Sequence, residues 1–275
     1  MTIELLQLKN DYTFKRVFGH AGNENITISL LNSILKEPVT NINLDRNKIL
    51  EEDLYNDKLG ILDIRAKINN SIDCDIEMQL VNENNVEKRI LFYLSKMYTQ
   101  NINKGQDYSK LNKCIAILFT DFSLKNLKSI HKYMTKWNLR EEKYNNVILT
   151  DSIEIYIIEL SKVQKYSENS KLDTWVNFII KSGDIDMENA DEAMKQAKEV
   201  LEEISNDEHE RYLADLRQKY NWEKKGIEEA GFERGVEEGS NKKQLEIAKK
   251  LKDEKVDISI IIKTTGLTKE EIEKL

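Results

Sequence analysis

The sequence predicts an α/β fold that continues into a helical C-terminal extension. Up to about residue 180, some segments carry apolar residues at three- and four-residue intervals, while in others apolar and polar residues alternate. The first spacing is that of an amphipathic helix and the second that of a half-buried strand. From Asp184 onward the chain is charged, helical in pattern and poor in large apolar residues.

The helices are expected where the apolar spacing is three or four. They cover residues 14–18, 26–35, 90–102 and 124–137, and the last apolar patch before the extension is 175–180. Pro38 is the only proline, and it follows the second of these segments and helps to stop it. Strands are expected at 44–50, 62–68, 72–80, 114–119 and 153–160. The run 114–119 is continuously apolar, which is typical of a central buried strand.

The two strands at 62–68 and 72–80 form a predicted hairpin around the turn at 69–71. Opposed residues share a face, so this turn determines which residues face each other. The predicted pairs are Leu62 with Met78, Ile64 with Ile76, Ala66 with Cys74, Arg65 with Asp75 and Lys67 with Asp73. The last two are favourable pairs of opposite charge. The same register sets Asp63 directly opposite Glu77, which is a juxtaposition of two acids without a local explanation.

Composition limits the class of protein. The chain has 275 residues, of which 40% are hydrophobic and 33% charged, and no stretch approaches the roughly 20 apolar residues that span a bilayer. The first residues lack the pattern of a signal peptide. We therefore expect a cytoplasmic protein with no membrane partner. Cys74 and Cys114 lie in apolar strand patterns, so we expect buried free thiols rather than a disulfide or a zinc site.

The net charge of −7 by itself argues against a nucleic-acid partner, but the acidity is unevenly distributed. Residues 183–275 have a balance of −8, and the rest of the chain has +1. The N-terminal part is therefore free to present a local basic surface.

Asp63, Glu77 and Gln79 are the candidate catalytic residues. Carboxylates on neighbouring strands lie roughly 5 Å apart and repel unless a cation or water separates them. Their oxygens suit Mg²⁺, which can acidify a bound water for attack on phosphorus. Gln79 lies two residues beyond Glu77 on the same face, where its amide can orient that water or a phosphate oxygen. From the pattern alone, solvated polar positions on an amphipathic hairpin are the commoner explanation.

The chain also resembles the PD-(D/E)XK nuclease family transposases, the Rpn family of recombination-promoting nucleases. The similarity covers nearly the whole chain and is carried by the segments at 10–15 and 60–66, by Ile76-Glu77-Met78-Gln79, by Arg89, Tyr93 and Tyr98, by Lys104-Gly105 with Tyr108, and by the C-terminal tail.

The resemblance implies a PD-(D/E)XK, restriction-endonuclease-like core with a mixed sheet flanked by helices. It implies that Asp63 and Glu77 bind Mg²⁺, or Mn²⁺ or Ca²⁺ in its place, and that DNA is the substrate. Gln79 stands where the superfamily has lysine, and Leu62 where its motif has proline. A glutamine carries no charge, so slow turnover or a required partner would follow. Asp11 and Glu24 are candidates for a further acidic ligand, although an ordinary structural role is the commoner one for each.

Three regions are expected: a nuclease-like domain at 1–182, a charged helical connector with recurring glycines at 183–240, and a helical hairpin at 241–275. Thr268 and Glu271 form a predicted capping box in that hairpin. Three functions remain open. The first is a metal-dependent DNA endonuclease of low sequence specificity that promotes recombination or mobile-element movement. The second is a catalytically weak factor that binds DNA or protein, or forms a homo-oligomer, through its C-terminal helices. The third is a defence or toxin-like factor gated by a partner, which would share the chemistry of the first.

Overall fold

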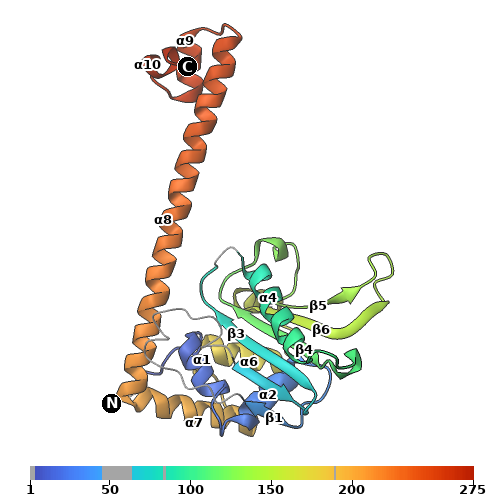
Figure 1. Ribbon diagram of the computed structural model, residues 1–275. Coiled ribbons are helices and arrows are strands. Elements are labelled where there is room, and N and C mark those ends of the chain that lie inside the picture. The colour runs from blue at the N-terminus through green and yellow to red at the C-terminus, as the bar shows by residue number, and fades with distance from the viewer. Residues whose placement is uncertain (1–3, 45–63, 83–84, 189) are drawn as a thin grey trace. The chain divides into compact units, whose positions relative to one another are not determined.

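The computed structural model describes residues 4–44, 64–82, 85–188 and 190–275. The chain divides into two compact units, Met1–Asn221 and Trp222–Leu275. The first unit contains a mixed six-stranded sheet with the order β1-β2-β3-β4-β6-β5 (Figure 1). Its strands are β1 (Ile42–Leu44), β2 (Ile64–Ile68), β3 (Ile72–Gln79), β4 (Lys113–Thr120), β5 (Met134–Arg140) and β6 (Ile148–Glu159). The pairs β3–β4 and β4–β6 are parallel, and the other pairs are antiparallel. The mixed α/β architecture is thus as predicted.

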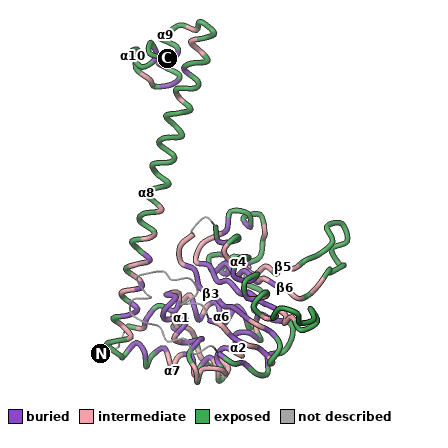
Figure 2. Tube along the Cα trace, viewed as in Figure 1, coloured by how far each residue is buried: buried purple, intermediate pink, exposed green. Residues whose placement is uncertain are grey.

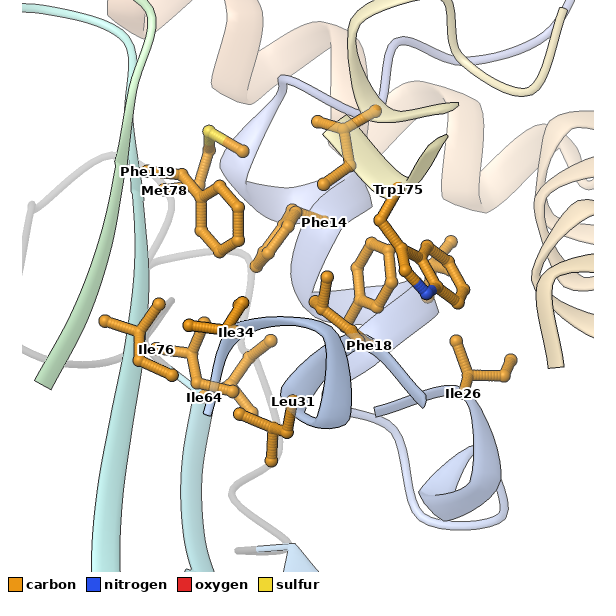
Figure 3. Packing of buried hydrophobic residues seen from close by; sticks show 14 of the residues in the cluster. Phe14, Phe18, Ile26, Leu31, Ile34, Ile64, Ile76, Met78, Phe119 and Trp175 are labelled. Carbon is orange, nitrogen blue, oxygen red and sulfur yellow. The ribbon is translucent and has the colours of Figure 1, made fainter. Parts of the chain in front are cut away.

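Helices cover both faces of this sheet. The helices of the first unit are α1 (Asp11–Phe18), α2 (Glu24–Ile34), α4 (Val86–Gln100), α5 (Val163–Tyr166), α6 (Lys171–Ile180) and α7 (Glu192–Asn206), with short 3-10 turns at Tyr108–Lys110, Lys125–Leu127 and Leu160–Lys162. Side chains of α1, α2, α6 and α7 share one core with β2 and β3, whereas α4 packs on the other face against β4. Figure 3 shows Phe14, Phe18 and Trp175 in the first of these cores.

Local signals set where helix α1 begins and ends. The Asn10 side chain accepts the backbone N–H groups of Tyr12 and Thr13, which is an N-terminal cap of α1. Gly19 follows α1 at a point where a Cβ atom would lie 2.8 Å from Cγ1 of Ile64. A side chain at this position would therefore separate α1 from the sheet.

The hairpin register is confirmed wherever the structure describes it. Ile64 pairs with Ile76, Ala66 with Cys74, and Ile68 with Ile72, around a turn in which Asn69 and Asn70 have positive φ. The charged pairs form as expected, at 3.3 Å between Arg65 and Asp75 and 3.8 Å between Lys67 and Asp73. Leu62 and Asp63 lie outside the described residues, and so does most of the strand expected at 44–50.

The helix expected at 124–137 is wrong. A 3-10 turn occupies Lys125–Leu127, and Met134–Arg140 is the edge strand β5, paired antiparallel with β6. The helical spacing arises because Leu124 and Leu127 are buried in the core under α4. Buried polar groups hold this segment in place: Glu159 accepts the N–H of Leu124, and Lys162 Nζ donates to the carbonyl of Leu127 at 2.7 Å. Tertiary hydrogen bonds therefore replace the helical ones here.

The first unit extends beyond residue 182, where the nuclease-like domain was expected to end. Helix α7 buries its apolar stripe in the core, with Met194, Ala197 and Leu201 each at most 1% exposed. Its N-cap Asp191 accepts hydrogen bonds from the backbone of Met194 and from Ser29 of α2. The pattern-based boundary therefore falls inside a packed part of the molecule.

Helix α8 (Glu208–Asp253) begins in the first unit, and its residues from 222 onward belong to the second. The second unit also holds α9 (Ile258–Thr265) and α10 (Lys269–Glu273), joined by Gly266 in the left-handed conformation. The predicted capping box of Thr268 and Glu271 is present. A small core of Ala248, Ile261 and Ile272 holds the three helices together.

Candidate active site

Glu77 and Gln79 lie at the C-terminal end of β3, on one face of the sheet. Residues two apart on a strand share a face. The neighbouring strand β4 runs parallel, with Glu77 beside Leu118 and Gln79 beside Thr120. Leu118 belongs to the core under α4, so Glu77 and Gln79 lie on the α4 side of the sheet.

The side chains of Gln79 and Arg89 both contact the carboxylate of Glu77. The amide Nε2 of Gln79 donates to Oε1 of Glu77 at 2.6 Å. The guanidinium of Arg89, from the first turns of α4, donates to the same oxygen and forms an ion pair with it. The side chains of Glu77 and Arg89 are 13% and 22% exposed. The site is therefore largely shielded but still reachable from solvent.

The side-chain carbonyl of Gln79 lacks a donor in the part of the chain that the structure describes. Its Oε1 is buried and has no hydrogen-bond partner among those residues, and an unsatisfied buried oxygen is costly. A divalent cation would satisfy it, because hard cations take carboxylate and amide oxygens as ligands. The Glu77 carboxylate and the Gln79 carbonyl thus fit such an ion chemically. Asp63, the other expected ligand, lies outside the described residues. Among the residues that are described, no three histidine, cysteine or acidic side chains gather in one possible metal cluster.

The two optional ligands have structural partners elsewhere. Asp11 is buried. Its carboxylate accepts hydrogen bonds from the guanidinium of Arg217 in α8, the shortest at 2.6 Å, and a longer one from Asn221 at 3.4 Å. Glu24 accepts the backbone N–H of Gly22 at 2.9 Å, just before α2. These contacts match the ordinary structural role.

A second charged pair lies beside Gln79 and was not expected. The backbone N–H of Asp121, just after β4, donates to the carbonyl of Gln79 at 3.0 Å. The Asp121 carboxylate forms an ion pair with Lys9 at 3.0 Å. An aspartate just beyond the predicted buried strand 114–119 was the signal in the sequence, since the ends of parallel strands commonly form sites.

The residues singled out on α4 have different environments. Tyr93 is buried and Tyr98 is half-buried, so both belong to the packed side of the helix, while Lys96 is exposed. Arg89 forms an ion pair with Glu77.

Both cysteines are buried and free, as predicted. Burial raises the pKa of the Cys74 thiol well above its ordinary value and that of Cys114 to about 12. Both thiols are therefore protonated at neutral pH.

Comparison with known proteins agrees with this fold. Residues 8–230 match the family described as PD-(D/E)XK nuclease family transposase. Neither the curated proteins nor the solved structures gave a match. Within the part of the chain that the structure describes, no helix has the length and apolar character needed to cross a membrane.

Proposed function

Because this chain belongs to the PD-(D/E)XK nuclease family transposases, we propose that it is a divalent-metal-dependent DNA endonuclease of low sequence specificity. Nucleases of this superfamily generally use divalent metal ions. The observation that carries the proposal is the pairing of Glu77 and Gln79 at the end of β3, where a buried oxygen of Gln79 has no partner among the described residues.

In this proposal Asp63 and Glu77 hold Mg²⁺, or Mn²⁺ or Ca²⁺, and Gln79 completes the oxygen set or orients the attacking water. The bound ion would acidify that water and neutralise charge at the phosphate. Gln79 is neutral, so stabilisation of the developing oxyanion would fall to the ion and to Arg89. Arg89 would contact the phosphate after leaving Glu77. Cleavage of this kind would be sufficient to promote recombination or the movement of mobile elements.

The test is plasmid nicking by the purified full-length chain with Mg²⁺, with EDTA, and with Glu77→Ala. Glu142→Ala is the matched control, because Glu142 is an exposed acid in the turn between β5 and β6. We expect nicking by the wild type and the control in Mg²⁺, and a loss of at least 100-fold in Glu77→Ala, since one carboxylate ligand is removed. Equal nicking by Glu77→Ala and wild type would contradict the proposal.

A second function is favoured by the second unit. Three large apolar side chains of α8 are at least 66% exposed: Trp222, Ile227 and Phe232. Such exposure is typical of helices that pack against a partner. In this alternative the protein is a weak nuclease that acts by binding DNA or protein, or by forming a homo-oligomer, through its C-terminal helices. Sedimentation of the full chain and of Phe232→Glu would test it, since a monomer in both cases excludes self-association through this face.

Arg89 allows the metal site to be tested without cleavage. Its guanidinium and a divalent ion would compete for the same oxygen of Glu77, so we expect Arg89→Gln to bind Mn²⁺ several-fold more tightly than the wild type. Calorimetry or the Mn²⁺ electron paramagnetic resonance signal measures this, with Lys96→Gln on the same helix as control. A weaker affinity in Arg89→Gln would instead mean that Arg89 positions Glu77 as a ligand.

A further inference from the structure

Helix α4 carries an unusual stripe on its solvent side. Lys88, Phe92 and Lys96 follow one another at four-residue intervals and are all exposed, Phe92 at 62%. Residues four apart on a helix are neighbours on one face. Successive members of the stripe therefore lie roughly 6 Å apart along the helix, given a rise of 1.5 Å per residue. The stripe is an aromatic ring between two cations.

A contact with the neighbouring Tyr93 supports the orientation of the Phe92 ring. Its edge-to-face contact with Tyr93 has a centroid separation of 5.4 Å and an interplanar angle of 77°. Tyr93 itself is buried. Phe92 thus presents a ring in a supported orientation, which lowers the entropy lost when a flat ligand stacks on it.

The two lysines differ from most cations around the sheet. Arg65, Lys67, Arg89, Lys113 and Lys136 each pair with a carboxylate. Neither Lys88 nor Lys96 forms an ion pair with any residue in the described part of the chain. The helix contains Glu87 as its one acid, against Lys88, Arg89 and Lys96. The solvent side of α4 is therefore locally basic in an acidic protein, and its charge complements an anionic ligand.

The stripe also lies next to the candidate active site. Arg89, which contacts Glu77, precedes Phe92 by three residues and follows Lys88 directly. Along the helix axis, Arg89 and Phe92 are less than one turn apart, about 4.5 Å at 1.5 Å per residue. A strand whose phosphate reached Glu77 would therefore pass close to this end of the stripe. In Figure 1, α4 lies along the sheet beside β3 and β4.

From these four observations we infer that α4 is a binding surface for single-stranded DNA, in which an unstacked base lies on Phe92 and the flanking phosphates contact Lys88 and Lys96. This inference rests on the proposed function for its substrate class and adds a preference for unpaired strands. Aromatic side chains stack on bases that have left the duplex, whereas paired bases are covered by their neighbours. Lysines contact phosphates without reading the sequence, which agrees with low specificity.

The experiment measures DNA binding by the full chain in EDTA, so that no cleavage is needed. Fluorescence anisotropy compares a labelled single strand with a blunt duplex of the same length. We expect Phe92→Ala to weaken single-strand binding about ten-fold, because one base–aromatic stack contributes 1–3 kcal/mol, and to change duplex binding less than about two-fold. Phe92→Tyr keeps the ring and should stay within about two-fold of the wild type for both DNAs. Phe92 is exposed, so circular dichroism should be unchanged in both variants.

Matched controls and salt dependence complete the test. Tyr108→Ala removes another exposed aromatic, at 81%, from outside α4, and it should leave the single-strand affinity unchanged. Lys88→Gln and Lys96→Gln should each reduce the slope of log affinity against log salt by about 0.7 on a single strand, whereas Lys143→Gln should not.

The inference is overturned if Phe92→Ala leaves single-strand binding unchanged, weakens both DNAs equally, or acts no differently from Tyr108→Ala. Self-association that disappears in Phe92→Ala while DNA binding persists would assign this face to a second copy, and would also overturn it. Its failure is distinguishable from failure of the nuclease proposal. If the wild type cleaves DNA normally but Phe92→Ala binds single strands as well as the wild type does, only this inference is refuted. If single-strand binding depends on Phe92 but the wild type cleaves no DNA, only the nuclease proposal is refuted.

Discussion

The two units of the chain bury their apolar residues to very different degrees. In Met1–Asn221, aromatic side chains such as Phe14, Phe18 and Trp175 are fully buried between helices and sheet. In Trp222–Leu275, the buried core consists of three residues, and most of α8 from residue 222 onward is exposed. Figure 2 shows this contrast as purple and green segments.

The contrast indicates that different interactions specify the two units. Packing determines the first, because its core residues come from segments far apart in sequence. Local signals dominate the second: helix caps at Asp257 and Thr268, the left-handed Gly266, and exposed ion pairs such as Lys250–Glu246 at 2.9 Å. Caps and exposed pairs contribute little individually. The second unit should therefore be the less stable, and four comparisons between matched residues test this.

The largest difference is expected between two tryptophans. Trp175 is 0% exposed in the first core, whereas Trp222 in α8 is 66% exposed. Trp175→Ala should reduce the free energy of unfolding by about 3–5 kcal/mol, because a large cavity is left. Trp222→Ala should change it by less than about 0.5 kcal/mol. Urea unfolding followed by circular dichroism measures both. A large loss of stability in Trp222→Ala would mean that this side chain is covered by a partner in solution.

The next comparison is between two ion pairs. Arg217 and Asp11 are both buried and joined at 2.6 Å, whereas Lys250 and Glu246 are exposed. Arg217→Ala should destabilise the protein by about 3 kcal/mol, because it leaves the Asp11 carboxylate buried without its main partner. Lys250→Ala should have no measurable effect. The double variant Asp11→Leu/Arg217→Met removes both charges, and it should regain most of the lost stability. If it regains none, packing rather than charge explains the loss.

Periodicity was a reliable guide where local pattern and tertiary structure agree. The hairpin register followed from the turn at 69–71 because a slip of one residue would expose every apolar side chain of β3. The shared face of Glu77 and Gln79 followed from the alternation of side chains along β3. The segment 124–137 could not be predicted, because Leu124 and Leu127 have helical spacing but are held by hydrogen bonds from Glu159 and Lys162. Such distant partners leave no local pattern.

Two other features could not be predicted for the same reason: the contact of Arg89 with Glu77 and the burial of α7 in the core. A basic residue on an amphipathic helix predicts a solvated face, and no spacing rule identifies which acid it meets. Helix α7 has few large apolar residues, so its composition resembled that of the connector. Its short stripe of Met194, Ala197 and Leu201 nevertheless packs in the core beside α1 and α2.

Two glycines make the third comparison. A Cβ at Gly19 would lie 2.8 Å from Ile64, whereas a Cβ at Gly235 in α8 would meet nothing within 4 Å. Gly19→Ala should therefore destabilise the first unit by about 1–3 kcal/mol through overpacking. Gly235→Ala should stabilise α8 by up to about 1 kcal/mol, because alanine favours the helix. Thermal unfolding followed by circular dichroism measures the sign of the stability change in each variant. A destabilising Gly235→Ala would show that a partner helix approaches this glycine closely.

The smallest effects are expected at two helix caps. Burial raises the pKa of Asp191, but its ion pair with Lys171 and its hydrogen bonds from Met194 and Ser29 outweigh this and lower it overall. Because the pKa of Asp191 is lower in the folded than in the unfolded state, where it is near 3.9, its ionisation stabilises the fold at pH values above about 3.9. This stabilisation is lost as the pH falls through the pKa of the folded state. Asp191→Ala should therefore cost about 1 kcal/mol at neutral pH, and progressively less at lower pH.

Asp257 caps α9 in the second unit, and its pKa is lowered by hydrogen bonds from Ser259. The Asp257 side chain is fully exposed and contacts the start of α9. Asp257→Ala should therefore fray α9 without changing the unfolding of the first unit. Hydrogen exchange separates the two outcomes: protection should fall in α9 alone for Asp257→Ala, and around α7 for Asp191→Ala. Removing a helix cap destabilises only the helix that it terminates, unless the two cores unfold together. A loss of protection in β3 or β4 in Asp257→Ala would therefore contradict independent unfolding of the two units.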